Sequence, residues 1–108
     1  MIYEKDLEKL IIRERLRAIY KGHPPFFSSL HEGFCVMKEE QEEFEEESKK
    51  AGQNVLDLWN LIKKDKSKAE LFQCIQSLKE NLINTFDELV MFATMVNKLE
   101  ARIKQKEK

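Results

Sequence analysis

The sequence predicts an all-α protein, and two observations carry this prediction. Only three glycines and two prolines occur in 108 residues, and all five lie between residues 22 and 52. Apolar side chains recur at intervals of three and four residues, which is the period of a helix, and the alternation typical of strands is absent. The length suits a single domain, residues 1–108, and we expect a helical bundle of four to five helices.

The composition bounds the class of protein. Hydrophobic residues make up 42% and charged residues 36% of the chain. A chain of 108 residues is small for a fully independent core, so we expect oligomerisation to complete the bundle. A net charge of −1 gives no basic field for nucleic acid. No apolar run approaches the roughly 18 residues of a membrane span and no signal peptide opens the chain, so we expect a cytoplasmic protein without membrane partners.

The first helix should run from about Tyr3 to Tyr20. Gly22 is a typical C-terminal stop, and the Pro24-Pro25 pair after it favours an extended turn. The apolar side of this helix consists of Leu7, Leu10, Ile11, Ile12, Leu16 and Ile19.

The second helix should begin at Ser29. The run Ser29-Leu30-His31-Glu32 fits a capping box, in which the serine and the glutamate satisfy each other's free backbone donors. We expect this helix to continue to about Lys50, and Ala51-Gly52 to break or kink it.

Two further helical segments follow. Val55, Leu58, Trp59 and Ile62 form an amphipathic stripe, and the lysine-rich run 63–68 reads as a polar turn. The last segment is either one helix or two with a break near residues 81–84, and we expect the chain to oligomerise through it. Its apolar positions form a heptad seam: Leu71, Ile75, Leu78, Leu82, Thr85, Leu89, Phe92, Val96, Leu99 and Ile103.

Residues 31–47 contain eight glutamates, which either form a solvated helical face or hold a cation. A helical wheel at about 100° per residue sorts them. Glu40, Glu43 and Glu47 line up on a strip beside the apolar side. Four more lie farther round, toward solvent: Glu39, Glu42, Glu45 and Glu46.

Glu88 falls inside the apolar arc of the last helix, whereas Asp87 points away and Asn84 lies near the same strip as Glu88. A carboxylate on an apolar face must be paired, protonated or bound to a cation. Glu40, Glu43 and Glu88 can therefore converge, and oxygen ligands of this kind suit Mg²⁺. The alternatives are a solvated glutamate face and an ion pair between Glu88 and a lysine or an arginine.

The run "SSLHEGFCVMKEEQEEF" resembles the phage and bacterial MazG-like nucleotide pyrophosphohydrolases, and "DELVMFATMVNKLEARI" resembles the second carboxylate-bearing helix of that family. The resemblance implies an all-α homodimer or homotetramer that hydrolyses a nucleoside triphosphate to the monophosphate and pyrophosphate with Mg²⁺. By position, Glu40 and Glu43 match the Glu-x-x-Glu ligands and Glu39 matches the preceding catalytic acid. Glu88 is the candidate third metal ligand.

The second motif departs from the family pattern of Glu-x-x-Asp. If Glu88 is its first acid, Met91 occupies the aspartate position; if Asp87 is its second acid, Asn84 occupies the glutamate position. Lys38 and Asn84 are candidate contacts for the substrate. The departure leaves two alternatives to the enzyme: a catalytically degenerate MazG-like protein that acts as an oligomeric interaction module, and a plain coiled-coil adaptor.

Overall fold

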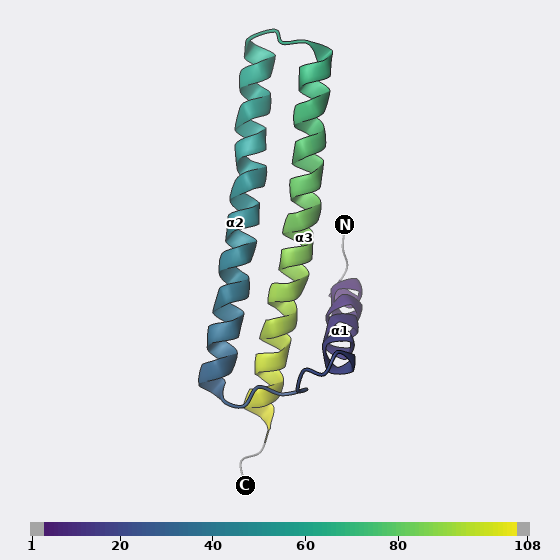
Figure 1. Ribbon diagram of the computed structural model, residues 1–108, viewed down its shortest axis with the longest axis vertical. Coiled ribbons are helices and arrows are strands. Elements are labelled where there is room, and N and C mark those ends of the chain that lie inside the picture. The colour runs from purple at the N-terminus through teal and green to yellow at the C-terminus, as the bar shows by residue number, and fades with distance from the viewer. Residues whose placement is uncertain (1–3, 106–108) are drawn as a thin grey trace. The chain divides into compact units, whose positions relative to one another are not determined.

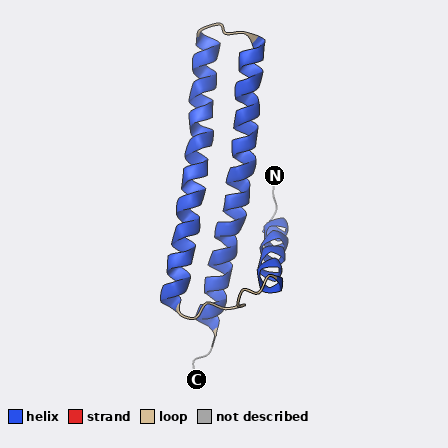
Figure 2. Cartoon of the chain, in the orientation of Figure 1, coloured by secondary structure: helices blue, strands red, loops and turns tan. Residues whose placement is uncertain are grey.

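A computed structural model describes residues 4–105, which form three helices joined by loops (Figures 1 and 2). Helix α1 spans Glu4–Tyr20, α2 spans Leu30–Lys63 and α3 spans Lys68–Lys104. No strand occurs within the described range, so the all-α prediction is confirmed there. The same range holds fewer helices than the four to five expected.

Helix α1 ends at the glycine that the sequence analysis selected. Gly22 has a φ of 97°, its N–H donates to the carbonyl of Ile19 at 3.0 Å, and the N–H of His23 donates to the carbonyl of Ala18 at 3.0 Å. This pair of hydrogen bonds is a Schellman motif, which satisfies carbonyls that the last helical turn leaves free. The predicted start of the helix at Tyr3 lies outside the described residues.

Helix α2 begins with half of the predicted capping box. The backbone N–H of Glu32 donates to Ser29 Oγ at 3.0 Å, as expected of an N-cap serine. The Glu32 carboxylate does not return to Ser29; it accepts hydrogen bonds from the hydroxyl and the backbone N–H of Ser28. These two hydrogen bonds lower the pKa of Glu32.

The predicted break at Ala51-Gly52 is wrong, because α2 continues to Lys63. A glycine inside a helix costs only about 1 kcal/mol relative to alanine. The apolar pattern runs through it, and Ala51 is buried. The segment carrying Trp59 is therefore the second half of α2 and not a separate helix.

The predicted polar turn is confirmed. It ends with the N-cap Ser67, whose hydroxyl accepts from the backbone N–H of Glu70 at 3.3 Å. Helix α3 then runs to Lys104 without a break near residues 81–84.

The chain divides into two compact units, each described by itself. The first, here the terminal unit, comprises α1, the part of α2 up to Glu42 and the part of α3 from Leu89. Phe27, Val90 and Thr94 are buried in it. Gly33 permits close packing there, because a Cβ at this position would lie 2.7 Å from the Phe27 ring and 2.8 Å from Leu99 Cδ1.

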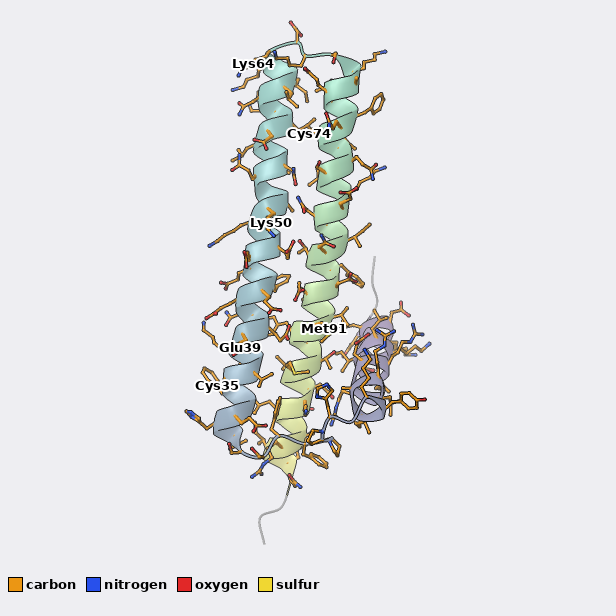
Figure 3. The ribbon with its side chains drawn as sticks, in the orientation of Figure 1. Cys35, Glu39, Lys50, Lys64, Cys74 and Met91 are labelled. Atoms are coloured by element: carbon orange, nitrogen blue, oxygen red, sulfur yellow. The ribbon has the colours of Figure 1, made fainter. Side chains whose placement is uncertain are left out.

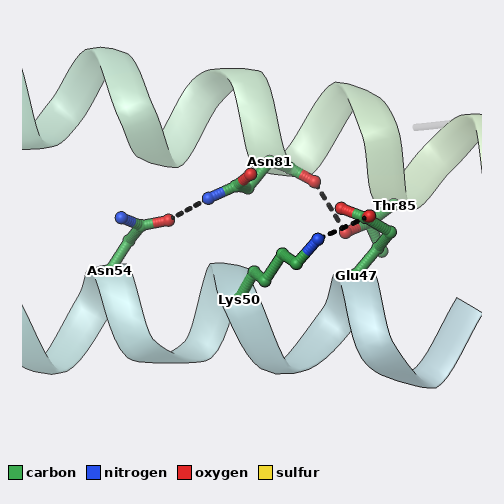
Figure 4. A network of polar contacts seen from close by, with 5 residues as sticks. All are labelled: Glu47, Lys50, Asn54, Asn81 and Thr85. Carbon is green, nitrogen blue, oxygen red and sulfur yellow. Dashed lines mark hydrogen bonds and ion pairs between the residues drawn. The ribbon is translucent and has the colours of Figure 1, made fainter.

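The second unit, here the hairpin unit, comprises residues 43–88, which are the end of α2, the turn and the start of α3. Polar contacts join its two helices. Asn81 Nδ2 donates to Asn54 Oδ1 at 2.6 Å (Figure 4), and Cys74 Sγ donates to the Asn54 carbonyl at 3.5 Å. Of residues 43–88, all of which are described, only Ala51 is buried. The hairpin unit therefore has almost no core of its own.

The heptad seam of α3 is partly uncovered, because four of its ten positions are exposed and six are half-buried. The four are Leu82 (52% exposed), Leu89 (37%), Val96 (44%) and Ile103 (64%). Its predicted role in oligomerisation stays a prediction. No helix in the described part of the chain combines the length and apolarity that crossing a membrane requires.

Candidate metal centre

The structure brings together the three carboxylates that the helical wheel grouped. Glu40 and Glu43 lie on consecutive turns of α2, and Glu88 lies on α3. One carboxylate oxygen from each of the three is within 4.8 Å of the other two. Glu40 and Glu88 are half-buried and Glu43 is exposed, so the group is open to solvent on one side.

Glu88 is electrostatically strained within the hairpin unit. Burial raises its pKa above the ordinary value, and the negative charge of Glu43 and a hydrogen bond between the two carboxyl groups raise it further. Glu47 and Asp87 add smaller effects in the same direction. Two carboxylates in hydrogen-bond contact need either a shared proton or a cation between them.

Glu47 is a further carboxylate near Glu88, outside the three-carboxylate group, and its charge contributes to the raised pKa of Glu88. Its Oε1 lies 3.0 Å from Lys50 Nζ (Figure 4), whereas its Oε2 is buried and accepts no hydrogen bond. Oε2 of Glu88 is also buried without a hydrogen bond. The sequence could have indicated that Glu47 lies near the group, because the helical wheel placed Glu47 on the same strip of the helix as Glu40 and Glu43.

The donor set is of the kind that divalent cations bind, because it consists of carboxylate oxygens. Mg²⁺ binds oxygen at about 2.0–2.1 Å, so neighbouring ligands stand about 2.9 Å apart and opposite ligands about 4.1 Å. The oxygens of Glu40, Glu43 and Glu88 lie within 4.8 Å of one another, so their side chains would have to rotate toward a common ion to bind it. A cation between Glu43 and Glu88 would compensate their negative charges without a shared proton.

The expected ion-pair alternative for Glu88 finds no support. Among the described residues, no lysine or arginine forms an ion pair with Glu88, and its electrostatic neighbours are acidic. Arg17 pairs with Glu14 at 3.6 Å, and Arg15 donates to Asn97 Oδ1 and to the Pro25 carbonyl.

The other predicted site residues lie outside the three-carboxylate group. Glu39 and Asn84 are exposed, and Lys38 donates to Gln41 Oε1 at 3.3 Å. Met91, at the position of an expected acid, lies on α3 (Figure 3). It lines a cavity of about 340 Å³ in the terminal unit together with Phe27. The lining of this cavity is mixed, because it also includes His23, Glu32 and Lys98.

Fold and site together define an all-α protein with a carboxylate cluster suited to a divalent cation. Comparison with protein-family models, with curated proteins and with solved structures finds no match for this chain. The function is therefore inferred from the cluster and from the motif of residues 29–44.

Proposed function

We propose that the protein hydrolyses a nucleoside triphosphate to the monophosphate and pyrophosphate with Mg²⁺ held by Glu40, Glu43 and Glu88. The observation that supports this most is the convergence of these three carboxylates from α2 and α3. The resemblance of residues 29–44 to the MazG-like pyrophosphohydrolases supplies the reaction class.

The residues of the cluster suit such a reaction. A carboxylate-bound divalent cation neutralises phosphate charge and lowers the pKa of bound water. Glu40, Glu43 and Glu88 would hold the ion. Glu39 and Lys38 are exposed on the same turn of α2, and in this proposal they serve as the proton acceptor and the phosphate contact.

The test is an assay of pyrophosphate release with Mg²⁺ and a panel of nucleoside triphosphates. Glu43→Gln keeps the size of the side chain and removes its charge, so it should abolish release. Glu46→Gln alters an exposed carboxylate outside the cluster and is the matched control. Equal activity of the two variants would contradict the proposal.

The second candidate is a non-catalytic helical interaction module that keeps the fold without a working metal site. The exposed apolar side chains of both units favour it, as does Met91 at the position of an expected acid. This candidate predicts weak stabilisation by Mg²⁺ and no pyrophosphate release from any triphosphate.

A further inference from the structure

The hairpin unit carries a row of large apolar side chains on each helix, exposed on α2 and partly exposed on α3. On α2, Val55 is 54% exposed, Trp59 56% and Ile62 47%. On α3, Leu82 is 52% exposed, and Leu71, Ile75 and Phe86 on the same side of the helix are half-buried.

Helix geometry places both rows on one face of the hairpin unit. At about 100° per residue, each row lies about a quarter turn ahead of the side chains that contact the other helix. The contacting side chains are represented by Ala51 and Asn54 on α2 and by Cys74 and Asn81 on α3. The quarter turn has the same sense on both helices when each is followed from its N-terminus to its C-terminus. Because α2 and α3 are antiparallel, the two rows therefore lie on the same face of the hairpin unit.

The charge of the hairpin unit is divided between its two ends. The segments 43–50 and 85–88, here the acidic end, contain six carboxylates and two lysines. The segment 63–70, here the turn end, contains four lysines and two carboxylates. Lys63 Nζ lies 5.5 Å from the centroid of the Trp59 ring, so positive charge borders the apolar face at the turn end.

We propose that this apolar face binds the same face of a second copy in the opposite direction, with each acidic end against the partner's turn end. Burying the two faces would form a four-helix bundle, which supplies the core that one hairpin lacks. The opposite direction matches unlike charges, whereas the same direction would stack lysines on lysines and carboxylates on carboxylates. A two-fold axis then crosses α2 near residue 53, the middle of its segment 43–63, and Gly52 is the adjacent residue on the face.

This pairing does not depend on the proposed hydrolysis. It stands on the exposed face and on the charges of the hairpin unit. A dimer without pyrophosphate release would therefore contradict only the proposed function, and an active protein without this pairing would contradict only the inference.

The position of the axis is tested by cross-linking. Gly52 is on the proposed face, and a Cβ added there meets no atom within 4 Å. In a background of Cys35→Ser and Cys74→Ser, Gly52→Cys should give a covalent dimer with a short bismaleimide linker. Gln53→Cys, exposed and turned away from the face, is the matched control. A dimer in solution whose Gly52→Cys variant cross-links no better than Gln53→Cys would overturn the proposal.

The direction is tested by charge exchange, followed by sedimentation equilibrium. Lys63→Glu and Glu45→Lys should each weaken the homodimer at least several-fold, because each places like charges together twice. Mixing the two variants should restore wild-type association, since the mixed dimer has two attractive contacts. Absence of restoration, or a wild-type protein that stays monomeric at high micromolar concentration, would overturn the proposal.

Discussion

At the scale of single residues, the surroundings of Glu88 indicate most about the function of the protein. It is half-buried on α3, one of its oxygens accepts no hydrogen bond, and its nearest charged neighbours are acids. Such a carboxylate reduces stability unless a proton or a cation compensates it. The stability that the Glu88 carboxylate costs favours a functional role for this residue, because ionisable groups with perturbed pKa values concentrate at functional sites.

The pH dependence of Glu88→Gln follows from this position. The pKa of Glu88 is higher in the folded chain than in the unfolded chain, so the folded state binds more protons between the two values. Stability therefore falls as pH rises from the ordinary value of 4.5 through the raised pKa, and the loss is complete above it. Glu88→Gln should raise the melting temperature at neutral pH without Mg²⁺.

Below pH 4.5 the same variant should melt close to the wild type, because Glu88 is then protonated in both states. Asp87→Asn, at the exposed neighbouring position, is the control and should change the melting temperature less. A Glu88→Gln variant that is less stable than the wild type at neutral pH would show that the carboxylate has a stabilising partner.

At the scale of elements, Gly52 shows how tertiary structure overrides a local break. Gly52 lies inside α2, and an added Cβ meets nothing within 4 Å. Gly52→Ala should therefore raise the free energy of unfolding by about 0.5–1 kcal/mol, measured by chemical denaturation.

Gly33→Ala is the matched contrast on the same helix. Its new methyl group would come within 3 Å of Phe27 and Leu99 side chains, so this variant should be destabilised. Destabilisation by Gly52→Ala would mean that α2 is broken there in solution, as the sequence analysis expected.

Helix boundaries that depend on residues at one helix end could be predicted from the sequence. Features that depend on packing between two helices could not. Gly22, Ser29 and the lysine-rich turn act through their immediate backbone, so the sequence located those boundaries. The continuity of α2 depends on packing around Ala51, which no local pattern states. The wheel sorted Glu40, Glu43 and Glu88 by direction, but the register between α2 and α3 decides that Glu47 also lies near Glu88.

At the scale of the whole molecule, the exposed apolar side chains favour association. If the hairpin unit is stabilised by a second copy, the melting temperature should rise with protein concentration. Trp59→Lys should remove this dependence, because it places a charge on the apolar face. Asn60→Lys, at the exposed next position, should retain it. A wild-type melting temperature independent of concentration would contradict association.

Binding of Mg²⁺ to the carboxylate cluster is the step on which the proposed function depends. It is measured by thermal unfolding across a Mg²⁺ titration of the wild type, Glu43→Gln and Glu46→Gln. A cation that binds only the folded state raises the melting temperature progressively with its concentration. The wild type and Glu46→Gln should show this rise, and Glu43→Gln should lose most of it. The same response in all three proteins would show that the glutamates form only a solvated helical face.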